Sequence, residues 1–296
     1  MKKAESRMYW LFLGVVLAWG LSWPVNKVGI EFIPPLWFAS LRLCIGSLAM
    51  FLLVFCLKKL KCPSMKDMPL IIIMGVFQIG FFVLFINLGL TVQAAGQAAI
   101  LVYTTPLWVM PIAIFFFKEE NSLRKWIGLA LGFAGVLIML SPWEIDWTNR
   151  EVLMDAAFLM GASFSLSISI LAARYMTWHS QPIELIPWQL LIGAIMVSSV
   201  AYNFQPHPVI HWNTISGISV AYTAIIASAL GFWGMGVVSK ELPSTLSSIG
   251  FLGVPVSGVL FSVLMLHEHV GYFMLIAMIC IITGILCILL SESKAT

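Results

Sequence analysis

Apolar stretches of about 20 residues, separated by short polar connections, follow one another along almost the whole 296-residue chain. A helix of this length spans the hydrocarbon layer of a bilayer, where only helices and closed barrels can satisfy their backbone polar groups. The chain is 60% hydrophobic and 10% charged, whereas soluble domains carry roughly 25% charged residues. We therefore expect an all-α integral membrane protein with ten transmembrane helices. Their expected ranges are 9–30, 36–57, 69–91, 94–117, 125–141, 152–173, 183–203, 214–237, 244–266 and 271–290.

The hydrophobic pattern occurs twice along the chain. At an offset of 147, Gly14, Ser22, Lys27, Pro35, Ile45 and Gly46 recur as Gly161, Ser169, Arg174, Pro182, Ile192 and Gly193. At an offset of 149, Pro106, Glu119, Ile127, Gly135 and Leu137 recur as Pro255, Glu268, Ile276, Gly284 and Leu286. Each copy holds five spans, so the second copy should be inverted relative to the first, as in carriers that work by alternating access. We predict a five-helix repeat at 1–142, an external linker at 143–151 and an inverted five-helix repeat at 152–296, packed around a central cavity.

Basic residues fall mainly on one side of this ten-span arrangement. That side holds Lys2, Lys3, Arg7, Lys58, Lys59, Lys61, Lys66, Lys118, Arg124, Lys125, Arg174, Lys240 and Lys294. Because loops rich in Lys and Arg stay in the cytoplasm, we expect both termini to be cytoplasmic. The chain has no basic domain, so we expect no nucleic-acid partner.

Polar side chains inside the spans are the candidates for a substrate site, because burying them in lipid is costly. Arg42 is the strongest, since its guanidinium needs an acceptor or an anionic ligand; a structural clamp with Glu31 or a carbonyl is the alternative. Lys27 either contacts the substrate or extends its amine to the membrane surface. Trp19, Trp23 and Asn26 share a helix face with Lys27. The remaining candidates are Gln78, Tyr103, Trp108, Gln189, Tyr222 and Trp233.

Prolines and glycines punctuate the same spans. Pro24, Pro106 and Pro255 are expected to break the first, fourth and ninth spans. We interpret them as hinges or cavity walls, with plain packing kinks as the alternative. The small residues Gly135 and Gly284 indicate that the fifth and tenth spans are packing helices, or else a dimer face.

Acidic residues lie at the predicted span ends or in loops, so no proton relay is visible. Coupling to H⁺ is left open through a peripheral carboxylate such as Glu31 or Asp155, and the matched pair Glu119 and Glu268 is expected to cap the helix that follows each. The turn His267-Glu268-His269 lacks the ligand spacing of a zinc site. No enzyme motif is present, and we expect no cofactor and no resident metal.

The run Trp19-Gly20 through Lys27, Pro35 and Arg42 resembles the opening of the EamA-type transporters of the drug/metabolite transporter superfamily. So does the pattern Pro106…Glu119…Gly128…Gly135, repeated as Pro255…Glu268…Ala277…Gly284. Ala277 replaces an expected glycine, and Leu166-Ser167 stands where a second tryptophan-glycine opening would fall. The resemblance covers essentially the whole chain. It implies a basket-like bundle that moves small metabolites, commonly amino acids outward, across the bacterial cytoplasmic membrane.

From these observations we expect a secondary transporter or facilitator for a small amphipathic metabolite, acting as a monomer or homodimer in the lipid bilayer. Efflux of drugs or toxic cations is the alternative within transport. An integral-membrane enzyme is the alternative from another class, and it would need a polar catalytic cluster at one membrane depth.

Overall fold

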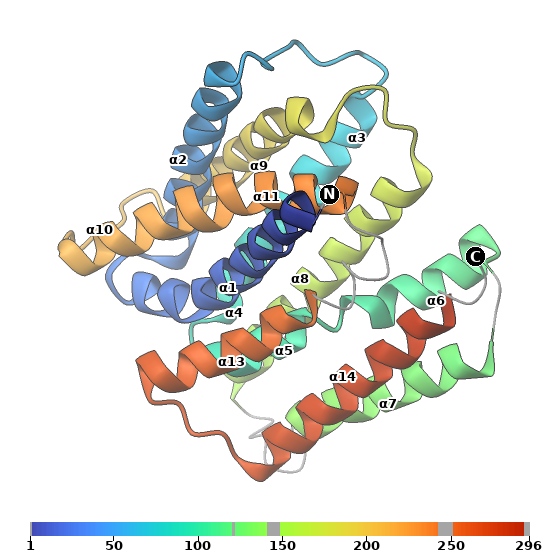
Figure 1. Ribbon diagram of the computed structural model, residues 1–296. Helices are drawn as coiled ribbons and strands as arrows, with labels where there is room; N and C mark the ends of the chain where they lie inside the picture. Colours follow the sequence, from blue (N-terminus) through green and yellow to red (C-terminus); the bar gives the residue numbers. More distant parts are fainter. Residues whose placement is uncertain (1, 120–121, 141–148, 242–250, 293–296) are drawn as a thin grey trace.

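The computed structural model describes residues 2–119, 122–140, 149–241 and 251–292, and the regular elements in those ranges are all helices (Figure 1). Long apolar runs form helices because a helix satisfies its backbone polar groups within itself. The chain order is α1 (Lys2–Phe32), α2 (Pro35–Cys56), α3 (Met68–Ile73), η1 (Met74–Phe81), α4 (Phe82–Gly89), α5 (Ala95–Val102), α6 (Thr105–Phe117), α7 (Leu123–Leu140), α8 (Arg150–Tyr175), α9 (Pro182–Phe204), α10 (Thr214–Ala221), η2 (Tyr222–Leu230), α11 (Gly231–Glu241), α13 (Gly253–Leu266) and α14 (Tyr272–Glu292). The segments η1 and η2 are π-helical.

Seven helical segments in these ranges are long and apolar enough to cross a bilayer, which makes the protein a multi-pass membrane protein. They are Met8–Phe32, Pro35–Cys56, Met68–Gly89, Ala95–Phe117, Arg150–Tyr175, Pro182–Phe204 and Thr214–Met235. Shorter apolar stretches follow at Gly253–Leu266 and Tyr272–Ile288. Most of the linker expected at 143–151 and the start of the span expected at 244–266 lie outside the described residues.

Two spans pass through a π-helical segment at matching places, η1 in the third expected span and η2 in the eighth. In each case a side chain from the other half of the sequence donates a hydrogen bond to a carbonyl of that segment. Ser165 Oγ donates to the Phe77 oxygen at 2.8 Å, and Trp19 Nε1 donates to the Ala227 oxygen at 2.9 Å. π-Helical turns are rare and collect at functional sites.

The prolines predicted as breaks occupy two different settings. The fourth span is divided between α5 and α6, and Pro106 lies in the first turn of α6, where a missing N–H leaves no hydrogen bond unmade. Pro255 lies in the first turn of α13 in the same way. Pro106 and Pro255 therefore begin helices and do not kink them, whereas Pro24 lies inside the continuous helix α1. Their role as hinges stays a prediction.

Helices α7 and α14 lie side by side and are close-packed through glycines (Figure 1). A Cβ added at Gly284 would lie 2.5 Å from the Gly128 oxygen, and one added at Gly135 would lie 2.8 Å from the Ala277 oxygen. Both contacts are with backbone atoms. The prediction that the fifth and tenth spans are packing helices is therefore confirmed.

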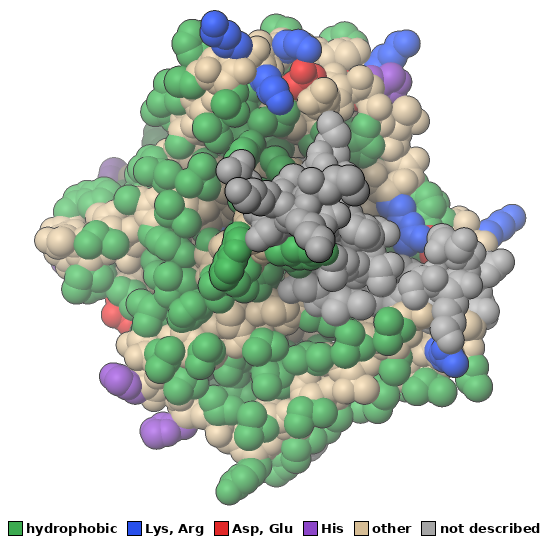
Figure 2. Space-filling view, in the orientation of Figure 1, with side chains coloured by type: hydrophobic (Ala, Val, Ile, Leu, Met, Phe, Trp, Pro, Cys, Tyr) green, Lys and Arg blue, Asp and Glu red, His purple; other side chains and the backbone are tan. Residues whose placement is uncertain are grey.

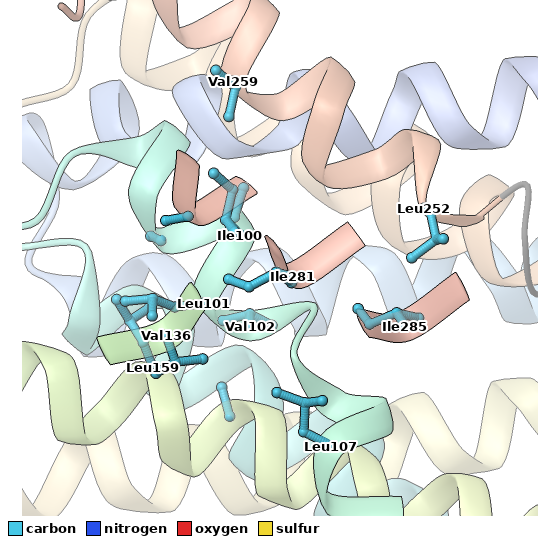
Figure 3. Close-up of a cluster of buried hydrophobic side chains, with 14 of the residues drawn as sticks. Ile100, Leu101, Val102, Leu107, Val136, Leu159, Leu252, Val259, Ile281 and Ile285 are labelled. Carbon is cyan, nitrogen blue, oxygen red and sulfur yellow. The ribbon is translucent and has the colours of Figure 1, made fainter. Parts of the chain in front are cut away.

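A buried apolar cluster connects this helix pair to the rest of the bundle (Figure 3). It brings together Ile100 of α5, Leu107 of α6 and Leu159 of α8 with residues of α7, α13 and α14. Elsewhere α1 packs against α13 and α11, α8 packs against α4 and α6, and α2 packs against α9 and η2.

Polar contacts join the connecting segments to one another at each end of the bundle. At the end that carries Lys61 and Arg174, which we call the lysine-rich end, Lys61 pairs with Glu184 at 2.8 Å, and Arg174 pairs with Glu119 at 2.8 Å. At the opposite end, the His211 N–H donates to the Phe32 oxygen at 2.9 Å. On the face shown in Figure 2, Lys and Arg side chains lie along the upper and right margins, and apolar side chains are spread over the rest of the described surface.

The lysine-rich end also buries the carboxylate of Asp67, just before α3. It accepts a 2.7 Å hydrogen bond from Ser180 Oγ and a 2.9 Å hydrogen bond from the His179 N–H. Burial by itself would raise the pKa of Asp67, but these hydrogen bonds and the nearby imidazole of His179 outweigh burial and lower it. Asp67 therefore holds the connection between α8 and α9 against the start of α3 as a carboxylate.

Candidate substrate site

Arg42 of α2 lies at the centre of a polar cluster formed by three spans, with only 6% of the residue exposed. Its Nε donates to Ser228 Oγ of η2 at 2.9 Å, and its Nη1 donates to Asn26 Oδ1 of α1 at 3.3 Å. Both partners are themselves fixed. Asn26 Nδ2 donates to the Ser22 oxygen at 2.6 Å, and Ser228 Oγ donates to the Thr223 oxygen at 2.8 Å. Each therefore presents a lone pair to the guanidinium.

The positive charge of Arg42 is not balanced by a carboxylate among the described residues. Asn26 and Ser228 are neutral. The alternative of a clamp with Glu31 or a carbonyl is not found among the described residues, because Arg42 donates to these two side chains instead. A guanidinium has five N–H donors, so three are left over. A buried cation without a counter-charge is strongly unfavourable, so this cluster is suited to an anionic ligand.

Gln189, the repeat partner of Arg42, occupies the corresponding place in the other half. It is 4% exposed, and its Nε2 lies 3.5 Å from Met74 Sδ of η1. Arg42 faces η2 and Gln189 faces η1, so the two polar positions are alike in setting and differ by one charge. The two halves therefore differ in charge at this pair of corresponding positions, as the sequence indicates.

Lys27 is not brought to this cluster. Its Nζ donates to the oxygens of Leu90, Thr91 and Gln93 at 2.6, 3.1 and 3.0 Å. An ammonium has three donors, so this geometry leaves Lys27 none for a substrate. It does not bind with Arg42; its amine reaches the connection between α4 and α5, at the end of the span, and holds that connection.

Two carboxylates hold the same connection from other directions. Asp155 of α8 accepts hydrogen bonds from Thr91 Oγ1 at 2.8 Å and from the Val92 N–H at 2.6 Å. Glu268 accepts from the Ala95 and Gly96 N–H groups at 2.7 and 3.0 Å. We call Lys27, Asp155 and Glu268 the loop clamp.

The matched acids Glu119 and Glu268 do not act as expected. Glu268 caps the N-terminus of α5, in the other half of the chain, and not the helix that follows it. Glu119 forms ion pairs with Arg174 at 2.8 Å and Lys125 at 3.7 Å and accepts from the Tyr175 hydroxyl. Helix capping was a local expectation, whereas both side chains make long-range contacts.

Among the aromatic candidates, four make contacts between spans. Trp19 stacks on Phe251 with ring centroids 5.7 Å apart while its Nε1 bonds to η2. Trp23 is 3% exposed and meets Tyr103 edge-on at 6.5 Å. The Tyr222 hydroxyl donates to the Ala18 oxygen at 2.9 Å. Trp19 and Tyr222 thus join α1 to η2, the segment that carries Ser228.

Other candidates keep a polar atom without a partner. Gln78 Oε1 and Trp108 Nε1 are buried and make no hydrogen bond; such atoms are rare in folded proteins and often accompany an absent ligand or water. Trp108 lies edge-on to Phe164 at 5.4 Å. Trp233 is partly buried and packs against the apolar cluster between α2 and α9. The structure therefore does not bring all the predicted residues into one site.

The sequence analysis missed two features. Ser228 binds Arg42 directly, but nothing in its local sequence separates it from other serines in the spans. An open groove of about 170 Å³ between η1, α4 and α8 is lined by phenylalanines and by Ser165. The spacing of four along Phe77, Phe81 and Phe85 could have indicated it.

Comparison with known proteins settles the family. The chain matches the EamA-like transporter family twice, over residues 6–141 and again over residues 154–290. It is a member of that family. YoaV of Bacillus subtilis, called an uncharacterized transporter, is 26% identical over 92% of this chain and 93% of its own.

Two relatives of this EamA-like protein have names that specify a substrate. One from Salmonella typhimurium, called a probable amino-acid metabolite efflux pump, is 26% identical over 93% of this chain and 92% of its own. One from Streptantibioticus cattleyicolor, called a probable terminal-alkyne amino-acid exporter, is 22% identical over 85% and 83%. A solved crystal structure covers 98% of this chain and 99% of its own with a TM-score of 0.65 at 16% identity, which shows a shared fold.

Proposed function

We propose that the protein is a secondary transporter or facilitator that exports an amino acid or a related amphipathic compound by alternating access. The observation that carries the proposal is the buried guanidinium of Arg42, held by neutral groups of α1 and η2 with donors to spare. A substrate carboxylate would complete this set of hydrogen bonds with a charge-assisted pair. Relatives named as amino-acid metabolite exporters support the same direction and substrate class.

We further propose ten spans in two inverted repeats, 1–142 and 152–296, around a central cavity. The pattern of helix contacts supports this arrangement. Spans one to five correspond to spans six to ten. The contact of α1 with α13 joins spans one and nine, and its counterpart is the contact of α8 with α6, which joins spans six and four. The pairs α2–α9 and α7–α14 each join a span to its own counterpart.

The positions of the connecting segments support the opposite orientation of the halves. Span one leads away from the lysine-rich end toward the Lys27 contacts, whereas span six leads from Asp155 toward Arg174 at the lysine-rich end. We assign the lysine-rich end, with both termini, to the cytoplasm of a bacterial cell and its inner membrane. The loop clamp would then close the outer side.

Alternating access requires that the loop clamp open and close. Its three charged groups come from α1, α8 and the turn before α14, and all bind one short connection. Movement of that connection would expose the cavity to the outside, with Pro24, Pro106 and Pro255 as the proposed hinge positions. Oligomeric state, as monomer or homodimer, does not enter this mechanism.

Counterflow in proteoliposomes tests the proposal. Vesicles containing the full-length protein are loaded with unlabelled leucine, phenylalanine or threonine, and uptake of the same labelled amino acid is followed. An alternating-access carrier gives transient uptake that depends on the internal amino acid. We expect Arg42→Gln to abolish this uptake and Lys61→Gln, at an exposed ion pair, to retain it. Uptake that does not depend on the unlabelled amino acid inside the vesicles would contradict the proposal.

Efflux of toxic cations remains the alternative substrate class. A cation would meet the unbalanced charge of Arg42, so the site opposes it electrostatically. Counterflow of a quaternary ammonium dye in place of the amino acids, retained in Arg42→Gln, would favour this alternative.

A further inference from the structure

The charge of the transported species can be deduced from the groups around Arg42, given the proposed function. We infer that the substrate is carried as a monovalent organic anion, such as an N-acylated or deaminated amino acid, and that the membrane potential drives its export without a coupling ion.

The first step is the charge balance at the polar cluster. Arg42 is 6% exposed, and its contacts with Asn26 and Ser228 bring no negative charge. A single carboxylate neutralises one guanidinium and can occupy two of its free donors in a planar, bidentate pair. One negative charge on the substrate is therefore what this site requires.

The second step concerns the ammonium group of an ordinary amino acid. Binding it would need a carboxylate or free carbonyls close to Arg42. On the described helices, acidic residues occur only in the first two turns or the last turn of each helix. They are Glu5, Glu31, Glu151, Asp155, Glu184, Glu241 and Glu292.

The neutral acceptors of the cluster each accept a hydrogen bond already. Asn26 Oδ1 accepts from Arg42, and the Ser22 oxygen accepts from Asn26. Ser228 Oγ accepts from Arg42 and donates to the Thr223 oxygen. A zwitterion would place its ammonium beside the guanidinium with no counter-charge from the described residues, and repulsion between the two cations would weaken its binding.

The third step limits the substrate to one negative charge. Lys27, the other cationic candidate from the first two spans, has its three donors on the oxygens of Leu90, Thr91 and Gln93. The carboxylates of Asp155 and Glu268, its partners in the loop clamp, are close enough to offset its charge. Of these two candidates, Arg42 is the one with donors left for a substrate.

The fourth step concerns the driving force. A cell keeps its interior negative, so a monovalent anion that leaves moves down the electrical potential. A membrane potential that maintains a tenfold gradient of a monovalent cation maintains a tenfold gradient of a monovalent anion in the other direction. The substrate's own charge thus supplies the coupling, which accounts for a bundle whose described helices carry acids only near their ends.

Three compounds on one carbon skeleton separate the possibilities: N-acetylleucine (an anion), leucine (a zwitterion) and leucinamide (a cation). Vesicles with the full-length protein receive an approximately tenfold higher K⁺ concentration outside and valinomycin, which makes the lumen positive. We expect N-acetylleucine to accumulate about tenfold inside, and leucine to approach equal concentrations at a much lower rate. Protein-free vesicles correct for leakage.

Variants connect the result to the residue. Arg42→Gln makes position 42 identical to its repeat partner, Gln189. We expect this variant to lose N-acetylleucine accumulation. Arg42→Lys keeps the charge and should retain part of it, while Lys61→Gln is the unaffected control. Circular dichroism and gel filtration establish that each variant is folded.

The outcomes are distinct. Leucine carried faster than N-acetylleucine, with no response to valinomycin, would overturn the anion inference and leave the proposed amino-acid exporter standing. Accumulation of N-acetylleucine that is the same with and without valinomycin would show coupling to an ion. It would overturn the inference that the membrane potential drives export. Preference for leucinamide, or no flux of any compound, would overturn the inference and the proposed function together. Anion flux unchanged in Arg42→Gln would remove Arg42 from the site and overturn the inference.

Discussion

Removing the Asp155 carboxylate should release the connection between α4 and α5. Asp155→Ala deletes the acceptor for Thr91 Oγ1 at 2.8 Å and for the Val92 N–H at 2.6 Å. A hydrogen bond to a charged group contributes about 1.5–3 kcal/mol. Thr91 and Val92 are exposed, so water replaces part of the loss. We expect a net shift of about 2 kcal/mol toward the released connection, or about 30-fold in its population.

Chemical labelling measures that population. Ala95 is fully buried, so a cysteine placed there reacts only when the connection lifts. Ala95→Cys is combined with Asp155→Ala in intact cells, and a membrane-impermeant maleimide is added outside. Mass spectrometry then follows modification of residue 95, and the labelling rate should rise about 30-fold because it tracks the open population.

Two further variants show whether the effect belongs to the hydrogen bonds. Asp155→Asn keeps one carbonyl oxygen as an acceptor and should raise the rate by only about fivefold, since the remaining bond is neutral. Glu151→Ala removes an exposed acid one turn earlier on α8 and should leave the rate unchanged. An unchanged rate in Asp155→Ala, or an equal rise in Glu151→Ala, would refute the role given to the carboxylate.

Three other predictions concern stability in detergent. Gly284→Ala puts a Cβ 2.5 Å from a backbone oxygen of α7 and should lower the free energy of unfolding by about 1–3 kcal/mol, whereas Gly14→Ala, with nothing within 4 Å, should be neutral or stabilising; equal effects would contradict the close packing. Trp19→Phe keeps a ring but removes the donor to the Ala227 oxygen, so the free energy of unfolding should fall by about 1–2 kcal/mol. An unchanged free energy of unfolding would mean that this hydrogen bond is unimportant. For Asp67→Asn, wild type should be more stable by a constant amount above pH 5, because a lowered carboxylate pKa stabilises the fold wherever the carboxylate is ionised. The difference should begin to shrink as the pH falls through 3.8, the value of an ordinary Asp carboxyl, and be lost below the lower pKa of Asp67 in the folded protein. A difference that grows in acid would show the reverse sign.

The spans and the close-packed helix pair could be predicted because they depend on local pattern. Apolar run length decides where helices cross the bilayer, and glycines at matched positions in the fifth and tenth spans indicate close backbone approach. The π-helical segments could not be predicted in this way. They are accompanied by hydrogen bonds from Ser165 and Trp19, which lie in the opposite half of the chain.

Of the residues in the polar cluster, the sequence singles out Arg42, whose charge is the most costly to bury in a span. Arg42 stands out because a guanidinium inside a span needs partners wherever the chain folds. Its actual partner Ser228 is 186 residues away and lies in an unremarkable run of small residues. The sequence could therefore offer only the nearby Glu31 or a carbonyl as alternatives to a substrate contact, and Arg42 donates to neither of them among the described residues. The partners of Lys27 could not be predicted for a similar reason, since main-chain carbonyls of a distant connection leave no mark in the sequence.

The reciprocal hydrogen bonds on η1 and η2 have a consequence for how the protein can be made. Each half supplies the donor that completes a span of the other, through Ser165 in one direction and Trp19 in the other. Each half on its own would leave this one carbonyl of its π-helical segment without its donor, a costly loss in lipid. When the two halves are produced as separate polypeptides, we therefore expect each to be more stable if the other is made in the same cell.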